Sequence, residues 1–288
     1  MQSVQLSCAP SLWALYLKVI LKHKSTSVVP PSLPHLSMSL NNVVMEKGKL
    51  DKYIDACGFT ASANIPVTYP HILAFPLHMS LLLDENCPFP MLGIIHIKNE
   101  ITQRRPISKD EIINIECQFG ELELVDKGVQ FDILTKITIE DELVWTSAST
   151  ILCPQKNIEQ ENKKSELQEL VEYSNTESWQ LRSNTGRRYA SASGDINPIH
   201  LSSFSARLFG FKHAIAHGMW SKAKALSVMA LPSGPYKVTA SFKRPVYLPS
   251  LVSFSSETTQ EGINFLLKNN DSGVPHLSGS LTYITPEN

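Results

Sequence analysis

The residues with the clearest capacity for chemistry lie in one short stretch, "YASASGDINPIH", at positions 189–200. It places the carboxylate of Asp195 five positions before the imidazole of His200, on a loop made of turn-forming residues. A carboxylate and an imidazole held together can move protons to and from a reacting group, which is general acid–base catalysis. The stretch also has a structural interpretation, because Asn197 is a good N-cap for a helix that begins with Pro198.

A possible partner for this pair follows downstream, where His217, Gly218 and Met219 precede the apolar segment "GMWSKAKALSVMAL" (218–231). That segment predicts a helix, and a helix N-terminus offers free backbone N–H groups and the positive end of the helix dipole. Gly218 would let a ligand approach this backbone closely. An oxyanion formed there would be stabilised, since losing one such donor costs roughly 3 to 4 kcal/mol of transition-state energy.

The elements that must position these residues occur twice in the chain. Each half has an apolar helical region, at 75–85 and at 218–231, followed by segments that alternate apolar and polar residues. Such alternation predicts antiparallel strands with one buried face. The corresponding strand-like segments are 112–115 and 251–254, 129–136 and 263–268, and 146–152 and 277–284, with Arg-Pro at 105–106 and 244–245.

This repetition predicts an α+β fold in which a sheet wrapped around a central helix is duplicated within one chain. The first half has no counterpart of the Asp195–His200 stretch. A structural turn would be expected in both copies, so the asymmetry favours a functional role for these residues.

Four regions are predicted along the chain. Residues 1–45 hold a short amphipathic helix within 12–21, too short to span a bilayer, and a Pro/Ser-rich extended connector within 25–42. Residues 46–154 form the first repeat, 155–178 a charged, solvated linker, and 179–288 the repeat with the catalytic stretch.

Bulk composition narrows the class of protein. The 288 residues are 42% hydrophobic and carry a net charge of −1, which gives no reason to expect a nucleic-acid partner. Five cysteines at wide spacings, with no CxxC pair, argue against a disulfide framework or a metal cluster. We therefore expect reduced thiols and a cytoplasmic protein with no membrane span.

The motifs together resemble the signature of the MaoC-like, or hydratase 2, family: "YASASGDINPIH", "IAHGM" at 215–219 and "ASFKRPVYLPS" at 240–250. The family comprises (R)-specific enoyl-thioester hydratases and dehydratases of the hot-dog fold, which belong to fatty-acid metabolism. The resemblance covers about residues 50–285, and the first half is similar to the non-catalytic leading repeat of double hot-dog members.

The resemblance implies a role for each site residue. Asp195 and His200 would be the catalytic pair, with the Gly218 amide on the thioester carbonyl. Asn197 would orient the pair, and His217 and Ser221 would line the substrate. Many relatives have Gln at the position of His217, so this residue departs from a common family pattern.

The implied reaction is the reversible syn hydration of trans-2-enoyl thioesters to (R)-3-hydroxyacyl thioesters, or the reverse dehydration. The substrate would be carried on the phosphopantetheine of coenzyme A (CoA) or acyl carrier protein (ACP), with its acyl tail in the first repeat and no cofactor. His213 and His217 have a spacing that could bind a metal on a helix, but without a third ligand we expect no metal. Solvated basic residues that could together meet phosphates are Arg187, Arg188, Lys212, Lys222, Lys224 and Lys243.

Two other functions stay open from the residues. One is an acyl-CoA thioesterase of the same fold, and the other is a non-catalytic subunit that binds acyl thioesters. The Asp195–His200 pair speaks against both, because neither needs it. The oligomeric state is also open between a monomeric pseudo-dimer and a homodimer.

Overall fold

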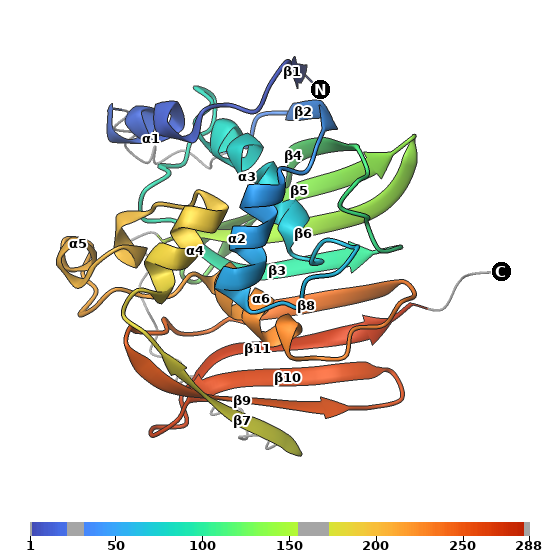
Figure 1. Ribbon diagram of the computed structural model, residues 1–288. Coiled ribbons are helices and arrows are strands. Elements are labelled where there is room, and N and C mark those ends of the chain that lie inside the picture. Colours follow the sequence, from blue (N-terminus) through green and yellow to red (C-terminus); the bar gives the residue numbers. More distant parts are fainter. Residues whose placement is uncertain (1, 22–31, 155–172, 285–288) are drawn as a thin grey trace. The chain divides into compact units, whose positions relative to one another are not determined.

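The computed structural model describes residues 2–21, 32–154 and 173–284 (Figure 1). The chain forms two compact units that alternate along the sequence. The first unit comprises Met1–Val44, Pro70–Asn99 and Asp110–Lys164, and the second comprises Met45–Tyr69, Glu100–Lys109 and Ser165–Asn288. The second unit contains every residue of the predicted site.

The first unit is an antiparallel meander of β4 (Ile113–Val125), β5 (Gly128–Ile139) and β6 (Glu142–Pro154). β2 (Leu36–Val43) pairs antiparallel with β4, and β1 (Gln2–Leu6) pairs parallel with β2. Asn99 of β3 (Ile95–Gln103) joins this sheet through the hydroxyls of Ser147 and Ser149 on β6.

Helix α3 (Tyr69–Leu82) supplies the core of the first unit. Ala74, Leu77 and Met79 are fully buried, and His78 Nε2 lies 2.7 Å from Thr135 Oγ1 on β5. The outer helix α1 (Leu12–Leu21) packs Leu15 and Val19 against Met79.

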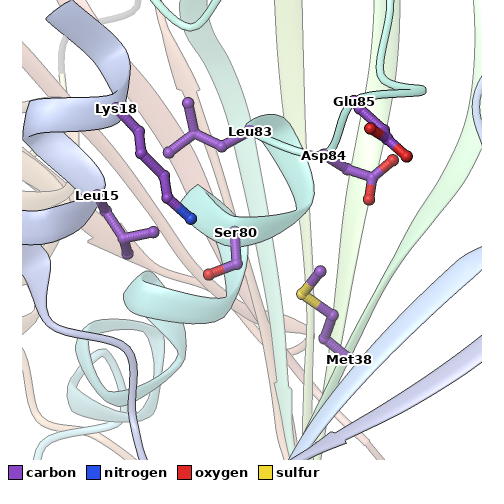
Figure 2. Close-up of a pocket in the computed structure, with 7 residues that line it drawn as sticks. All are labelled: Leu15, Lys18, Met38, Ser80, Leu83, Asp84 and Glu85. Atoms are coloured by element: carbon purple, nitrogen blue, oxygen red, sulfur yellow. The ribbon is translucent and has the colours of Figure 1, made fainter. Parts of the chain in front are cut away.

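An open pocket of about 560 Å³ lies between α1, β2 and the C-terminal end of α3 (Figure 2). None of the predicted site residues lines it. Its lining residues are Leu15, Lys18, Met38, Ser80, Leu83, Asp84 and Glu85.

The sheet of the second unit has the order β8-β11-β10-β9-β7, and every neighbouring pair is antiparallel. Helix α6 (Gly218–Ser227) packs against it with Ala223, Ala225 and Leu226 buried. The strands are β7 (Asn175–Leu181), β8 (Tyr236–Phe242), β9 (Ser250–Thr258), β10 (Gly262–Asn269) and β11 (Pro275–Tyr283).

Four helical elements complete the second unit: α2 (Lys47–Cys57), α4 (Thr185–Ser193), η1 (Pro198–His200) and α5 (Ser203–Arg207). The indole Nε1 of Trp220 donates to the carbonyl of Ala56 at 2.9 Å, which joins α6 to α2. Arg188 on α4 forms an ion pair with Asp55 on α2 at 2.8 Å. These contacts hold α4, which leads into the Asp195–His200 stretch.

The α+β prediction is confirmed, because each unit combines an antiparallel sheet with a buried helix. Helix α6 begins at Gly218 as predicted but ends at Ser227, before position 231. Helix α3 spans Tyr69–Leu82 rather than 75–85, because the helix continues through Pro76 and accommodates Pro70 in its first turn.

The N-terminal helix over 12–21 is confirmed as α1. The prediction of a connector over 25–42 is wrong for residues 36–42, which belong to strand β2 (Leu36–Val43). Leu36, Met38 and Leu40 alternate with serines, a period-two pattern that the Pro/Ser-rich composition obscured. Residues 25–31 of that connector lie outside the described residues.

The predicted linker over 155–178 lies mostly outside the described residues, and 175–178 belong to strand β7 rather than to a linker. The repeat boundaries at 46–154 and 179–288 stay predictions. Within the described ranges, no helix is both long and apolar enough to cross a membrane.

Candidate active site

The loop that carries Asp195 begins where helix α4 ends. Gly194 adopts the left-handed conformation (φ 77°), and its N–H closes the helix on the carbonyl of Ala190. Three local hydrogen bonds, each between residues two positions apart, then fold the loop. Asp195 N donates to Ser193 Oγ at 3.2 Å, and Asn197 N donates to Asp195 Oδ1 at 3.2 Å. Ile199 N donates to Asn197 Oδ1 at 3.4 Å. Side chains of these types stabilise turns by such local bonds.

The imidazole of His200 is fixed by the carbonyl of Ile215. Its Nδ1 lies 2.8 Å from that oxygen, which can only accept, so Nδ1 carries the proton. In the neutral ring, Nε2 is therefore the lone-pair nitrogen. Burial lowers the pKa of His200 below its usual 6.5, although Asp195 and the bond to Ile215 act in the opposite direction. The site thus holds a neutral imidazole with a free acceptor nitrogen.

His217, the N-cap residue of α6, is buried against the same loop. Its Nε2 donates to the backbone carbonyl of Asp195 at 3.0 Å and lies 3.8 Å from Asp195 Oδ2. The ring stacks on His200, with centroids 3.6 Å apart, and contacts the ring of Tyr189 at 4.8 Å. Burial, followed by the neighbouring His200, lowers the pKa of His217 to about 3.

The structure brings three of the predicted site residues together, since Asp195, His200 and His217 each offer an atom within 4.8 Å of the other two. The carboxylate side chain is 31% exposed, so solvent or a ligand can reach it. Gly218 follows directly as the first residue of α6. A Cβ on Gly218 would lie 3.0–3.2 Å from the ring of Phe242, so the ring packs closely against this backbone.

The other two predicted residues make mainly local contacts. The side chain of Asn197 caps η1, so its link to Asp195 runs through its backbone N–H. Ser221 is buried on α6, and its hydroxyl donates to the carbonyl of His217 at 3.4 Å.

Within the described residues, those close enough to hold a metal are Asp195, His200 and His217, rather than the His213–His217 pair considered from spacing. His213 is exposed and lies against the ring of Tyr247. The bond from His217 Nε2 to the carbonyl of Asp195 leaves only Nδ1 of that ring as a potential ligand. Metal-free chemistry stays a prediction.

Among the six basic residues expected at the surface, Lys222 is a wrong prediction, because it is fully buried. Its Nζ donates to the carbonyl of Val238 on β8 at 3.2 Å, and burial lowers its pKa while Glu100 opposes that shift. Lys222 lies on the side of α6 that packs against the sheet. Arg187, Arg188, Lys212, Lys224 and Lys243 are not buried.

One residue that sequence reasoning missed is Gly186 on α4. A Cβ there would lie 2.2 Å from the backbone carbonyl oxygen of His200, so only glycine allows α4 to approach the loop that carries His200 this closely. A glycine inside the helical segment "TGRRYASAS" was the available signal, since it lowers helix propensity and often marks close packing.

Residues 163–278 match the family profile described as "MaoC like domain". This part of the chain is similar to MaoC-like domains. The chain is also 29% identical over 258 residues to "3-hydroxyacyl-thioester dehydratase X" of Mycobacterium tuberculosis, a match that covers 88% of this chain and 92% of that protein. The resemblance inferred from the signature is therefore confirmed.

Solved structures of MaoC-like proteins match the fold of this chain. HtdX of Mycobacterium tuberculosis matches with a TM-score of 0.76 and 27% identity, over 86% of this chain and 100% of that one. A MaoC-like dehydratase from Phytophthora capsici matches with a TM-score of 0.71 over 88% of this chain and 96% of that one. Its identity of 14% supports the fold alone.

Proposed function

We propose that the protein is a 3-hydroxyacyl-thioester dehydratase that interconverts (R)-3-hydroxyacyl and trans-2-enoyl thioesters by loss or syn addition of water. One observation carries the proposal: in the MaoC-like domain, Asp195 and His200 come within 4.8 Å of each other beside the residue that caps α6. The dehydratase of Mycobacterium tuberculosis that this chain resembles supports the reaction class.

In the dehydration direction, the Asp195–His200 pair takes a proton from C2 of the thioester. The negative charge develops on the thioester oxygen, where the Gly218 N–H and the positive end of α6 stabilise the enolate. The C3–O bond then breaks as the pair returns a proton to the departing hydroxyl, which leaves as water. One proton is taken and one is given, so the pair ends as it began.

The local contacts suit these roles. His200 Nε2 is the acceptor nitrogen, because Nδ1 is committed to Ile215, while the partly exposed Asp195 carboxylate can hold the water. His217 and the Asn197 N–H fix Asp195, and Ser221 lies one turn into α6. The chemistry needs proton transfer and enolate stabilisation only, so no cofactor or metal is part of the proposal.

The substrate is carried on CoA or ACP in this proposal, and the protein is cytoplasmic. All five cysteines lie among the described residues as free thiols, and four of them are buried. Reduced, buried thiols are typical of a cytosolic protein.

The test is to follow the absorbance of the conjugated enoyl band of crotonyl-CoA and trans-2-decenoyl-CoA with purified protein. We expect the band to decay as the (R)-3-hydroxyacyl product forms. Asp195→Asn and His200→Ala should each lower kcat by about 10²–10⁴-fold. The exposed His213→Ala is the matched control and should keep its activity.

Two outcomes would contradict the proposal. Release of free thiol without hydration would indicate the thioesterase instead. Absence of turnover at every chain length, on CoA and on ACP, would indicate the non-catalytic binding subunit.

A further inference from the structure

An exposed apolar surface lies on the segment that joins His200 to His217. Phe204, Leu208 and Phe209 are 77%, 74% and 40% exposed, respectively. Phe204 and Leu208 are four positions apart on α5 and its C-cap, so their side chains lie on one side of the helix. Single exposed apolar residues are ordinary, but three large ones within residues 204–209 indicate an interaction site. We call these three residues, with Arg207 and Lys212, the α5 patch.

The segment under the α5 patch is held firmly in place. Ser202 caps α5 by accepting from Ser205 N at 3.0 Å, and Ala206 is fully buried beneath the helix. Ser205 Oγ donates to the carbonyl of Pro198 in η1 at 2.7 Å. At the other end, Ile215 N donates to the carbonyl of Ile199 at 3.0 Å. The apolar side chains therefore stand on a supported helix next to the proposed catalytic residues.

The two charged residues of the α5 patch are basic, and they lie in a part of the sequence that is rich in basic residues. Between residues 182 and 256 the sequence has ten Lys and Arg but a single acidic residue, Asp195, although the whole chain has 26 basic and 27 acidic residues. Arg207 Nε donates to the carbonyl of Lys212 at 3.4 Å, and Arg187 Nη1 donates to that of Leu201, just before α5, at 2.9 Å. In the ranges the structure describes, no carboxylate forms an ion pair with Arg187, Arg207 or Lys212.

We propose that the α5 patch docks an acidic acyl carrier protein, which presents the thioester on its phosphopantetheine arm to Asp195 and His200. The proposal rests on the proposed function, for which it names the carrier. Free CoA offers phosphates to Arg207 and Lys212, but it has no surface that would cover three exposed large apolar side chains. A small acidic protein can contact both the apolar and the basic side chains of the α5 patch. Apolar residues form the centre of a protein–protein interface, and opposite charges steer the encounter of the two proteins.

The kinetic test compares one acyl group on two carriers. For wild type, the double variant Arg207→Glu/Lys212→Glu and the variant Leu208→Ser, kcat/KM is measured with the enoyl group on CoA and on ACP. For Leu208→Ser we expect kcat/KM on ACP to fall by about tenfold or more, as for a central interface residue, while kcat/KM on CoA stays within about twofold. For Arg207→Glu/Lys212→Glu we expect a larger fall on ACP than on CoA, because CoA meets these two side chains through its phosphates alone.

A matched control comes from the first unit, where Leu124 is 66% exposed and Lys127 is also exposed, at the turn between β4 and β5. The variant Leu124→Ser/Lys127→Glu makes the same kind of change in the unit that does not contain α5, and kcat/KM should stay unchanged for both substrates. An equal fall on CoA and ACP in the α5 variants would overturn the proposal, and so would an unchanged kcat/KM on ACP.

A binding measurement separates this proposal from the proposed function. Fluorescently labelled holo-ACP without an acyl group is titrated with the protein, and we expect affinity that weakens with salt and is lost in Arg207→Glu/Lys212→Glu. Binding of holo-ACP without turnover of any thioester would contradict the proposed function but support the α5 patch as a docking site. Turnover of enoyl-CoA without binding of holo-ACP at low salt would overturn the docking site and leave the enzyme.

Discussion

The imidazole ring of His217 lies face to face with that of His200, at a centroid distance of 3.6 Å and an interplanar angle of 26°. Two imidazolium cations in this arrangement would repel each other, and burial lowers the pKa of both rings, so both are neutral. His217 also holds the backbone of Asp195 through its Nε2–H. We infer that His217 is a positioning residue for the proposed catalytic pair.

His217→Gln and His217→Ala should therefore differ. Gln retains an N–H donor that can bond the carbonyl of Asp195, whereas Ala leaves that carbonyl unpaired and opens a cavity beside His200. We expect kcat within about tenfold of wild type for His217→Gln and lower by about a hundredfold for His217→Ala, since an unpaired buried group costs about 1–3 kcal/mol. Equal kcat in the two variants would argue against positioning through this bond.

The pH dependence of kcat/KM should report His200. The ring must be neutral to accept a proton, and burial lowers its pKa below 6.5. As pH falls, the neutral form persists through 6.5 and is lost only at the lowered pKa, so the acid limb is expected below pH 6.5. The profile is measured with an enoyl-CoA substrate in a constant-ionic-strength buffer series. An acid limb assigned to His200 above pH 6.5 would contradict the buried neutral ring.

Local patterns were sufficient to predict the framework of the fold. Alternation of apolar and polar residues located β4, β5 and β6 in the first unit and β9, β10 and β11 in the second, but not β1 or β7. The apolar run after His217 located the start of α6. Serines hid the alternation of β2, and Lys222 gave no local sign that its turn of α6 faces β8. Burial of a polar residue depends on what packs against it, which the sequence around that residue does not contain.

The sequence was sufficient to name the candidate residues that the structure brings together, but not the bonds that fix them. The sequence placed Asp195, His200 and Gly218 as candidates because carboxylate, imidazole and helix N-terminus serve one chemistry. The bonds that fix their geometry run to backbone carbonyls far along the chain, from His200 to Ile215 and from His217 to Asp195. Every residue has a backbone carbonyl, so the sequence does not indicate which carbonyl accepts a given hydrogen bond. These partners can be identified only in the folded structure.

Gly186→Ala should disrupt the site without touching any reacting group. The Cβ of the alanine would overlap the carbonyl oxygen of His200 at 2.2 Å, so α4 and the loop that carries His200 must move apart. We expect a loss of kcat of about tenfold or more together with a lower melting temperature, since overpacking costs about 1–3 kcal/mol. Gly48→Ala on α2 is the control, because its Cβ would meet nothing within 4 Å. Wild-type activity in Gly186→Ala would show that the loop tolerates the displacement.

Chelation provides a direct test of the metal-free proposal. Asp195, His200 and His217 are close enough to bind a metal ion. However, His217 Nε2 is already bonded to the carbonyl of Asp195, and His200 Nε2 is the acceptor nitrogen that the proposed catalysis needs. We therefore expect dialysis against EDTA to leave kcat unchanged, and added Zn²⁺ to inhibit by taking that lone pair. His213→Ala should show the same inhibition, because His213 lies outside the group. Activity that EDTA abolishes and a divalent metal restores would instead make the ion part of the catalytic machinery, with His200 as its ligand rather than as a base.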